Sequence, residues 1–209
     1  MRDADGRPLY RLVQALDVTE RKTTEERLRF LADHDPLSGV FNRRRFEAEL
    51  QRELDLSASR PRRSVLLLLD VDRFKAINDT LGHATGDAVI ERLGDALRSR
   101  LRSADVVARL GGDEFAAILR RVDLDAAREG ARDLQTVAAQ RLASIVGEGH
   151  GAVTLSAGLV SIGEGASPDE LLSLADRALY AAKAAGRDRI VVDGETVAAP
   201  ETADSSAAA

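Results

Sequence analysis

Two carboxylates stand directly after an apolar run, at a place where chemistry could occur. Residues 64–69 read Ser-Val-Leu-Leu-Leu-Leu, which is typical of a buried strand, and Asp70-Val71-Asp72 follow at its end. Carboxylates at a strand end can hold a hard divalent cation, and Lys75 nearby could hold a phosphate oxygen at the same place. The segment alone is equally consistent with a solvated strand terminus.

A second acidic cluster lies in residues 109–115, which read RLGGDEF. The paired Gly111 and Gly112 between two apolar stretches predict a tight hairpin and would let a ligand approach the backbone closely. Asp113 and Glu114 could complete a metal site with Asp70 if the two strands are neighbours. A Gly-Gly hairpin is usually only a turn, but two acidic strand ends in one domain resemble the way nucleotidyl-transfer enzymes hold two metal ions.

Polar residues that could bind a nucleotide lie between and after these clusters. Asn78 and Asp87 bracket a glycine-punctuated stretch at the start of a helical pattern. A carboxylate suits the N1–H and N2–H donors of guanine and an amide can serve its N7 and O6, although ordinary helix capping explains the same residues. Lys183 and Arg187 are four apart on one expected helix face and could neutralise a triphosphate or be solvated surface charges.

A scaffold of strands and helices must bring these residues together. Apolar periodicity predicts helices at residues 41–56, 77–101, 126–146 and 168–185, the last with Ser167 as its cap and Pro168 in its first turn. Strands are predicted at residues 64–69, 106–110, 115–119, 152–160 and 189–192. The core order β-α-β-β-α-β indicates an α+β sandwich of ferredoxin-like, polymerase-palm-like type, with a central, mainly antiparallel sheet flanked by helices.

Composition narrows the class of function. The chain has 209 residues, 44% of them hydrophobic, which suits one compact domain with flanking segments. A formal net charge of -5 without a block of Lys or Arg predicts no binding of a DNA or RNA polymer and no membrane contact in this fragment. The absence of cysteine excludes disulfides and zinc-thiolate sites and fits a cytoplasmic location, and three scattered histidines disfavour a His-rich metal site.

The main body is expected at residues 33–193, with a different kind of segment at each end. Residues 1–18 are similar to one strand of a truncated domain, and residues 19–32, rich in charged helix formers, predict a connector helix. Residues 194–209 have the Ala, Ser, Thr and acidic composition of a disordered tail.

The motifs together resemble the GGDEF domain of diguanylate cyclases over about residues 33–192. The signature is Gly111-Gly112-Asp113-Glu114-Phe115, and four further motifs stand in the family order. They are Asp35-Pro36-Leu37-Ser38-Gly39-Val40-Phe41-Asn42-Arg43-Arg44; Asp70-Val71-Asp72-Arg73-Phe74-Lys75-Ala76-Ile77-Asn78-Asp79 with Gly82-His83 and Gly86-Asp87; Thr154-Leu155-Ser156-Ala157-Gly158; and Ala175-Asp176, Ala178-Leu179-Tyr180, Ala182-Lys183 and Gly186-Arg187. Ser38 and Val40 stand where Thr and Leu are more usual.

The resemblance implies a reaction and assigns residues to it. Such a domain condenses two GTP molecules into cyclic di-GMP and two pyrophosphates, using Mg²⁺ or Mn²⁺ with two ions at each half-site. Each domain holds one GTP, so the implied active form is a homodimer. The resemblance gives metal-binding or catalytic roles to Asp70, the Val71 carbonyl, Asp113 and Glu114. It gives substrate-binding roles to Phe74, Lys75, Asn78, His83, Asp87, Gly111, Gly112, Lys183 and Arg187.

The resemblance also implies regulation. Arg102 and Asp105 form an Arg-x-x-Asp string five residues before Gly111, which is the position of the family's inhibitory site for the product, cyclic di-GMP. A second arginine of that site could be any of three, namely Arg128, Arg132 or Arg141. Residues 1–18 are similar to the end of a PAS sensor domain, which would act through a signalling helix at 19–32. The complete protein could be attached to a membrane upstream.

Other functions compete with an active cyclase. A GGDEF domain without turnover would bind GTP or cyclic di-GMP as a sensor module, but such domains usually lack part of the signature or a metal carboxylate, and both are intact here. A related cyclase could make a different cyclic dinucleotide, although Asp87 favours guanine. A purely structural domain would leave the acids, glycines and cations unexplained.

Overall fold

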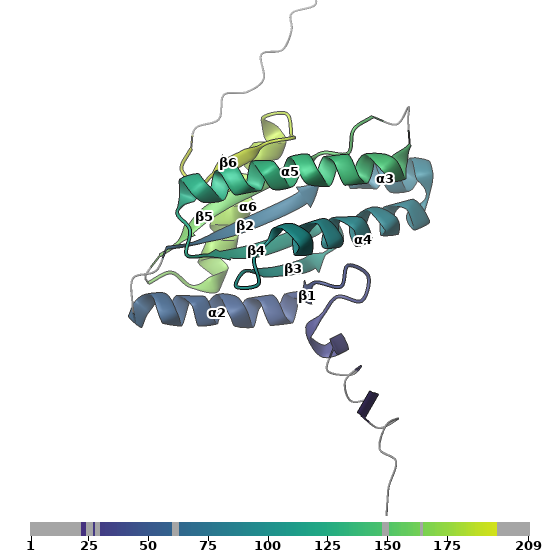
Figure 1. Ribbon diagram of the computed structural model, residues 1–209. Coiled ribbons are helices and arrows are strands. Elements are labelled where there is room, and N and C mark those ends of the chain that lie inside the picture. The colour runs from purple at the N-terminus through teal and green to yellow at the C-terminus, as the bar shows by residue number, and fades with distance from the viewer. Residues whose placement is uncertain are drawn as a thin grey trace, which may run out of the picture. The chain divides into compact units, whose positions relative to one another are not determined.

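The structure is a computed structural model that describes residues 22–23, 27, 30–59, 63–147, 151–163 and 165–195 (Figure 1). Its strands are β1 (Phe41–Asn42), β2 (Ser64–Val71), β3 (Val106–Gly111), β4 (Glu114–Arg120), β5 (Leu155–Ile162) and β6 (Ile190–Val192). Its labelled helices are α2 (Arg43–Ser59), α3 (Phe74–Leu81), α4 (His83–Arg100), α5 (Leu124–Val146) and α6 (Pro168–Ala184). Among the residues so described, no helix is long and apolar enough to cross a membrane.

The strands form one mixed sheet in the order β1-β3-β4-β2-β5-β6. The central strands β3, β4, β2 and β5 pair antiparallel, and their order is that of the ferredoxin-like β-α-β-β-α-β arrangement. β1 and β6 extend the sheet at its two edges, each parallel to its neighbour. The predicted α+β class, with a mainly antiparallel sheet flanked by helices, is therefore confirmed.

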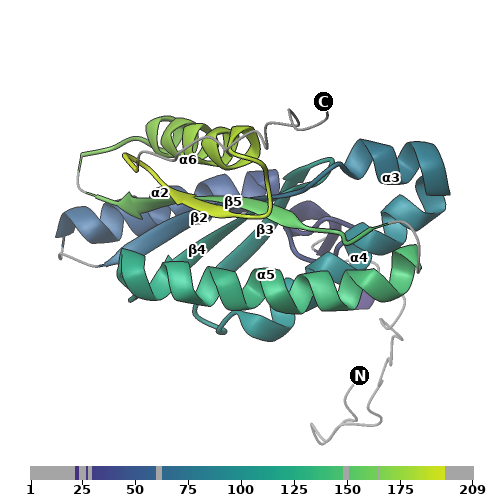
Figure 2. The ribbon, with the colours of Figure 1, turned by 90° about the horizontal axis from the view of Figure 1, so that it is seen from above.

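Helices cover both faces of the sheet, which explains why the central strand β2 is buried along its whole length (Figure 2). Side chains alternate between the two faces of a strand. Accordingly, Leu67 and Leu69 pack into the core that α4 and α5 cover, whereas Leu66 and Leu68 pack into the core beneath α2 and α6. The uninterrupted apolar run thus ends with its last residues held rigidly between two helical layers.

Three predicted elements differ from the observed ones. The single helix expected at 77–101 is wrong, because the chain forms α3 and α4 separated by Gly82, whose φ of 85° no helix can accommodate. The helix expected from residue 41 begins only at Arg43, because Phe41 and Asn42 pair with β3 as a two-residue strand too short to show periodicity. The strand expected at 152–160 lies instead at Leu155–Ile162, in register with β2.

The structure describes only a small part of the two flanking segments. Residues 1–18 and 196–209 are outside the described residues. Of the connector helix expected at 19–32, residues 22, 23, 27 and 30–32 are described, and they are helical.

Candidate active site

The two acidic clusters meet at one end of the sheet. β2 and β4 are antiparallel neighbours, and Asp70 lies directly opposite Glu114 in their register. Asp113 precedes Glu114 in the hairpin turn, and its negative charge acts on Asp70. A shared metal site requires the two strands to be neighbours, and they are. The carboxylates of Asp70 and Asp113 therefore lie at the same end of the sheet.

A lysine from α6 completes this cluster. Lys183 Nζ lies 2.7 Å from Asp70 Oδ2, and Asp70 itself is only 6% exposed. Burial raises the pKa of Asp70 to about 6; the hydrogen bond from Lys183 opposes the rise and the charge of Asp113 adds to it. Burial also raises the pKa of Asp113, while Lys183 and Arg109 oppose that rise. Ionisation of the two carboxylates is therefore unfavourable, even with Lys183 in place.

This electrostatic cost predicts that Asp70→Asn stabilises the metal-free domain at high pH. The folded-state pKa of Asp70 lies above its ordinary value of 3.8, so its contribution to stability is complete below that value and is lost as the pH rises through about 6. Asparagine does not ionise. We expect the variant to gain about 1 kcal/mol in unfolding free energy at pH 8, a value discounted for partial solvent screening.

Urea denaturation in the presence of a chelator measures this gain. The difference from wild type should stay nearly constant between pH 8 and about pH 7, shrink as the pH falls through about 6, and vanish below about pH 4. A variant that is less stable than wild type at pH 8 would show that the Lys183 pair outweighs the cost of burying the charge.

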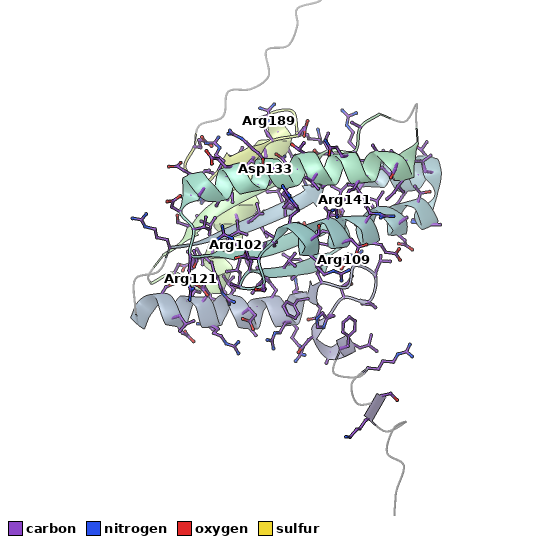
Figure 3. The ribbon with its side chains drawn as sticks, in the orientation of Figure 1. Arg102, Arg109, Arg121, Asp133, Arg141 and Arg189 are labelled. Atoms are coloured by element: carbon purple, nitrogen blue, oxygen red, sulfur yellow. The ribbon has the colours of Figure 1, made fainter. Side chains whose placement is uncertain are left out.

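The glycine turn that carries Asp113 is fastened by an arginine. Gly111 and Gly112 both have a positive φ, a conformation that glycine adopts without steric cost. Arg109, which is labelled in Figure 3, donates from Nε to the Gly112 carbonyl at 2.8 Å and from Nη1 to Asp35 Oδ1 at 3.1 Å. Burial alone would raise the pKa of Asp35, but hydrogen bonds from Ser38 and Arg109 outweigh it and lower the pKa. The turn is thus tied to a segment 74 residues away in the sequence.

The expected guanine readers also come together. Asn78 lies on α3, and Asp87 and His83 lie on the first turns of α4, beyond the break at Gly82. Gly86 is buried directly beneath Asn78, and a Cβ at this glycine would overlap Asn78 Oδ1. Asn78 is therefore packed against the residue that precedes Asp87 in α4.

Because the resemblance implies that Asn78 reads the guanine of GTP, the close packing predicts that Gly86→Ala impairs GTP binding. The added methyl group would displace the Asn78 side chain, so we expect the KM for GTP to rise about tenfold, the loss of roughly one good hydrogen bond. Steady-state kinetics would measure the change. In an Asn78→Ala background the same substitution should add little, and an undiminished effect there would contradict the explanation.

The remaining expected phosphate contacts lie at the start of α3 and just after α6. Phe74 and Lys75 form the first turn of α3, which begins three residues after β2 ends. Arg187 follows α6 and has a positive φ of 66°. Asp72, the second carboxylate of the strand end, accepts hydrogen bonds from Thr154 and Ser156 at 2.7 Å each, so its carboxylate is engaged by the protein itself.

The residues fit a divalent cation in charge and chemistry. Asp70 and Asp113 offer two carboxylates, and the Val71 carbonyl follows Asp70 directly. The raised pKa values of both acids mark a place where added positive charge is favourable. Across the described ranges, no group of three or more His, Cys, Asp or Glu side chains is poised to hold a metal, so oxygen ligands from the substrate would have to complete the coordination.

The expected inhibitory site lies at the other end of α4. Asp105 accepts hydrogen bonds from the backbone N–H groups of Arg102 and Arg120 at 3.0 Å each, which shapes the turn before β3. Arg102 and Asp105 line a cavity of about 190 Å³ between α4, β4 and α5, which Asp133 of α5 also lines (Figure 3).

The candidates for a second arginine are distributed differently. Arg128 pairs with Glu195 and lines another cavity together with Arg132, whereas Arg141 donates to Ser99 on α4. The cavity with Arg102 and Asp105 is lined instead by Arg100 and Arg120.

Comparison with known proteins identifies a family, related sequences and related structures. Residues 32–189 match the family described as "Diguanylate cyclase, GGDEF domain". The chain belongs to this family. Among curated relatives, it is 38% identical over 196 residues to the probable diguanylate cyclase DgcE of Escherichia coli, covering 90% of this chain and 17% of that protein. It is also 38% identical over 179 residues to the diguanylate cyclase DgcM of E. coli, covering 84% of this chain and 42% of that one. The chain therefore spans less than half the length of these relatives.

Solved structures of the GGDEF family share the fold. The coiled coil and GGDEF domain of DgcB from Caulobacter crescentus, in complex with c-di-GMP, superposes with a TM-score of 0.76 at 30% identity, covering 84% of this chain and 93% of that one. Diguanylate cyclase SiaD from Pseudomonas aeruginosa, in complex with its activator SiaC, superposes with a TM-score of 0.71 at 34% identity, covering 84% and 69%. The matched region does not bear out the expected PAS remnant at residues 1–18.

Sequence reasoning about this GGDEF domain missed the residues that hold its site in place. Arg109 and Asp35 were present in the motifs, but their contact joins two segments whose proximity depends on the pairing of β1 with β3. The hydroxyl groups of Thr154 and Ser156 likewise reach Asp72 only because β5 pairs with β2. A sequence signal exists only for Thr154 and Ser156, which are polar residues in or next to an otherwise apolar strand segment.

Proposed function

We propose that the chain is a diguanylate cyclase that condenses two GTP molecules into cyclic di-GMP and two pyrophosphates. The observation that carries the proposal is that Asp70 and Asp113 lie together at one end of the sheet, beside Lys183. The match of residues 32–189 to the cyclase family supports the same reaction. The cyclase domain is proposed to comprise residues 33–193.

The chain's own residues would bind and orient GTP. Asn78 and Asp87 would read the guanine edge, with His83 and the Gly111-Gly112 backbone beside the nucleotide. Lys183, Arg187, Lys75 and the backbone at Phe74 would hold the triphosphate, because cations and helix-start N–H groups suit its charge. Glu114, opposite Asp70, would lie near the ribose 3′-hydroxyl and position it or accept its proton.

A divalent metal, Mg²⁺ or Mn²⁺, fits the carboxylate pair and would supply charge stabilisation at the α-phosphate and the departing pyrophosphate. Asp70, Asp113 and the Val71 carbonyl would hold it. In each step the 3′-oxygen of one GTP forms a bond to the α-phosphorus of the other, the bond to pyrophosphate breaks, and the hydroxyl proton is lost to a base.

The reaction requires two copies of the domain. One domain holds one GTP, so forming both phosphodiester bonds needs two substrates facing each other in antiparallel orientation. We propose a homodimer as the active form, with both domains contributing a nucleotide to the same product. A chain of this length could be monomeric in dilute solution and gain activity only as its concentration rises.

The dependence of rate on protein concentration tests this proposal. GTP and Mg²⁺ are incubated with the purified chain over a hundredfold range of its concentration, and cyclic di-GMP is measured by chromatography. A rate that rises faster than linearly with protein supports assembly of two domains. A strictly proportional rate for a chain that sedimentation shows to be monomeric would overturn it, and GTP binding without any product would favour a sensor module.

We also propose product inhibition at the cavity that contains Arg102 and Asp105. The guanidinium group of Arg102 can pair with a phosphate of cyclic di-GMP. We expect Arg102→Ala to raise the product concentration that halves the rate by at least about tenfold, the loss of one charge-assisted contact. Arg92→Ala, which removes an exposed arginine on α4 that does not line this cavity, is the matched control. Equal inhibition of both variants and wild type would place the regulatory site elsewhere.

A further inference from the structure

Asp72 is a buried carboxylate that the proposed reaction leaves without a role. It is 6% exposed and lies immediately beyond the end of β2. Its Oδ1 accepts a hydrogen bond from Ser156 Oγ at 2.7 Å, and its Oδ2 accepts one from Thr154 Oγ1 at 2.7 Å and one from the Asp188 backbone N–H at 3.1 Å. Three donors, from β5, from the segment before it and from the α6–β6 connection, therefore converge on one side chain.

Unusual backbone conformations surround this carboxylate. Among the described residues four non-glycine residues have a positive φ, and three of them, Arg73, Arg187 and Asp188, lie next to Asp72 in sequence or in space. Non-glycine residues rarely adopt this conformation, and it persists only where surrounding contacts hold it. The hydrogen bond from Asp188 N–H to Asp72 is such a contact.

The two connections that contain these residues, β2–α3 and α6–β6, carry the proposed triphosphate contacts. Arg73, with a φ of 57°, precedes α3 and directs its first turn, which contains Phe74 and Lys75. Arg187, with a φ of 66°, adjoins Asp188. Arg73, Arg187 and Asp188 line one cavity of about 390 Å³ together with Asp72 and Thr154, so both connections border the same cavity as Asp72.

We propose that Asp72 is a positioning residue for GTP, which acts with Thr154 and Ser156 to hold Arg187 and the start of α3 in the arrangement that receives the triphosphate. This inference rests on the proposed function. Asp72 touches neither the base nor the reacting atoms; its effect passes through the Asp188 backbone to Arg187, and through Arg73 to α3. Loss of the contact should therefore weaken binding of the β- and γ-phosphates and leave binding of the guanine base intact.

Thr154 offers a mild way to test the contact, because its side chain is only half-buried. Thr154→Val removes the hydroxyl donor and keeps the shape, whereas Thr154→Ser keeps the donor. The probes are 3′-deoxy-GTP, which lacks the attacking hydroxyl and so cannot react, and GMP, which lacks the β- and γ-phosphates. Calorimetry with Mg²⁺ measures both affinities.

We expect Thr154→Val to weaken binding of 3′-deoxy-GTP about fivefold, with GMP changed less than about twofold, and Thr154→Ser to restore the wild-type affinity. In an Arg187→Ala background Thr154→Val should have less than half of its effect. Asp72→Asn, which keeps one acceptor oxygen, should show the same preference for the triphosphate probe.

Three results would overturn the inference: equal losses for both probes, unchanged triphosphate binding in Thr154→Val, or an undiminished effect without Arg187. If the wild-type chain binds neither nucleotide, the proposed function is overturned together with the inference. If the wild-type chain binds 3′-deoxy-GTP and one of the three results is found, only the inference about Asp72 is overturned.

Discussion

Asp113→Asn is expected to lower cyclic di-GMP synthesis by about a thousandfold. The substitution preserves the shape of the side chain and removes the charge that, with Asp70, would hold the divalent metal. Metal stabilisation of the transferring phosphoryl group contributes several kcal/mol to the reaction, and each 1.36 kcal/mol corresponds to tenfold in rate. Burial raises the pKa values of both Asp70 and Asp113, so neutralising Asp113 should leave the fold intact. The initial rate at saturating GTP measures the loss.

Asp125→Asn is the matched control for this experiment. It makes the same chemical change on an exposed side chain in the first turn of α5, away from the hairpin. Its rate should lie within about twofold of wild type, because Asp125 is exposed and is none of the proposed metal or GTP contacts. Retention of more than a tenth of wild-type activity by Asp113→Asn would show that Asp113 is not a metal ligand in the reaction.

Gly158→Ala is expected to cause the largest loss of stability. Gly158 lies in the middle of β5 where α6 crosses it, and a Cβ at this position would meet the Ala175 carbonyl oxygen and the Leu179 backbone nitrogen. Backbone atoms cannot rotate away as a side chain would, so the helix must shift. We expect a loss of about 3 kcal/mol in unfolding free energy, which lowers the Tm by roughly 6 to 12 °C.

Gly130→Ala provides the opposite expectation from the same chemical change. Gly130 lies within α5, and an added Cβ there would meet no atom within 4 Å. Alanine favours helix more strongly than glycine, so this variant should gain about 0.5 to 1 kcal/mol. Thermal unfolding of both variants checks the pair. A Gly158→Ala domain as stable as Gly130→Ala would mean that α6 does not rest closely on the sheet.

The sequence predicted the elements that have a strong apolar period and the chemistry at their ends. The run at 64–69 is apolar at every position because β2 is covered on both faces, and Asp70 stands out only because it interrupts that run. The paired glycines at 111 and 112 predicted a hairpin, and the register of β2 with β4 then brings Asp70 opposite Glu114. These features depend on local sequence and could be predicted.

Features that depend on contacts between distant segments could not be predicted from local sequence. β1 is two residues long and exists because Phe41 and Asn42 pair with β3. The break between α3 and α4 at Gly82 is local, but the apolar spacing does not reveal it because apolar residues continue at helical spacing on both sides. Asp72 was considered a possible metal ligand because it is two residues from Asp70, whereas its carboxylate is bonded to Thr154 and Ser156.

The mass and stoichiometry of the product formed from GTP and Mg²⁺ test the central claim most directly. The purified chain is incubated with GTP at high protein concentration, the nucleotide products are resolved by chromatography and mass, and the released pyrophosphate is counted. A diguanylate cyclase must yield cyclic di-GMP with two pyrophosphates for each molecule of product. Release of one pyrophosphate with only a linear dinucleotide, or bound GTP with no product at any protein concentration, would contradict it.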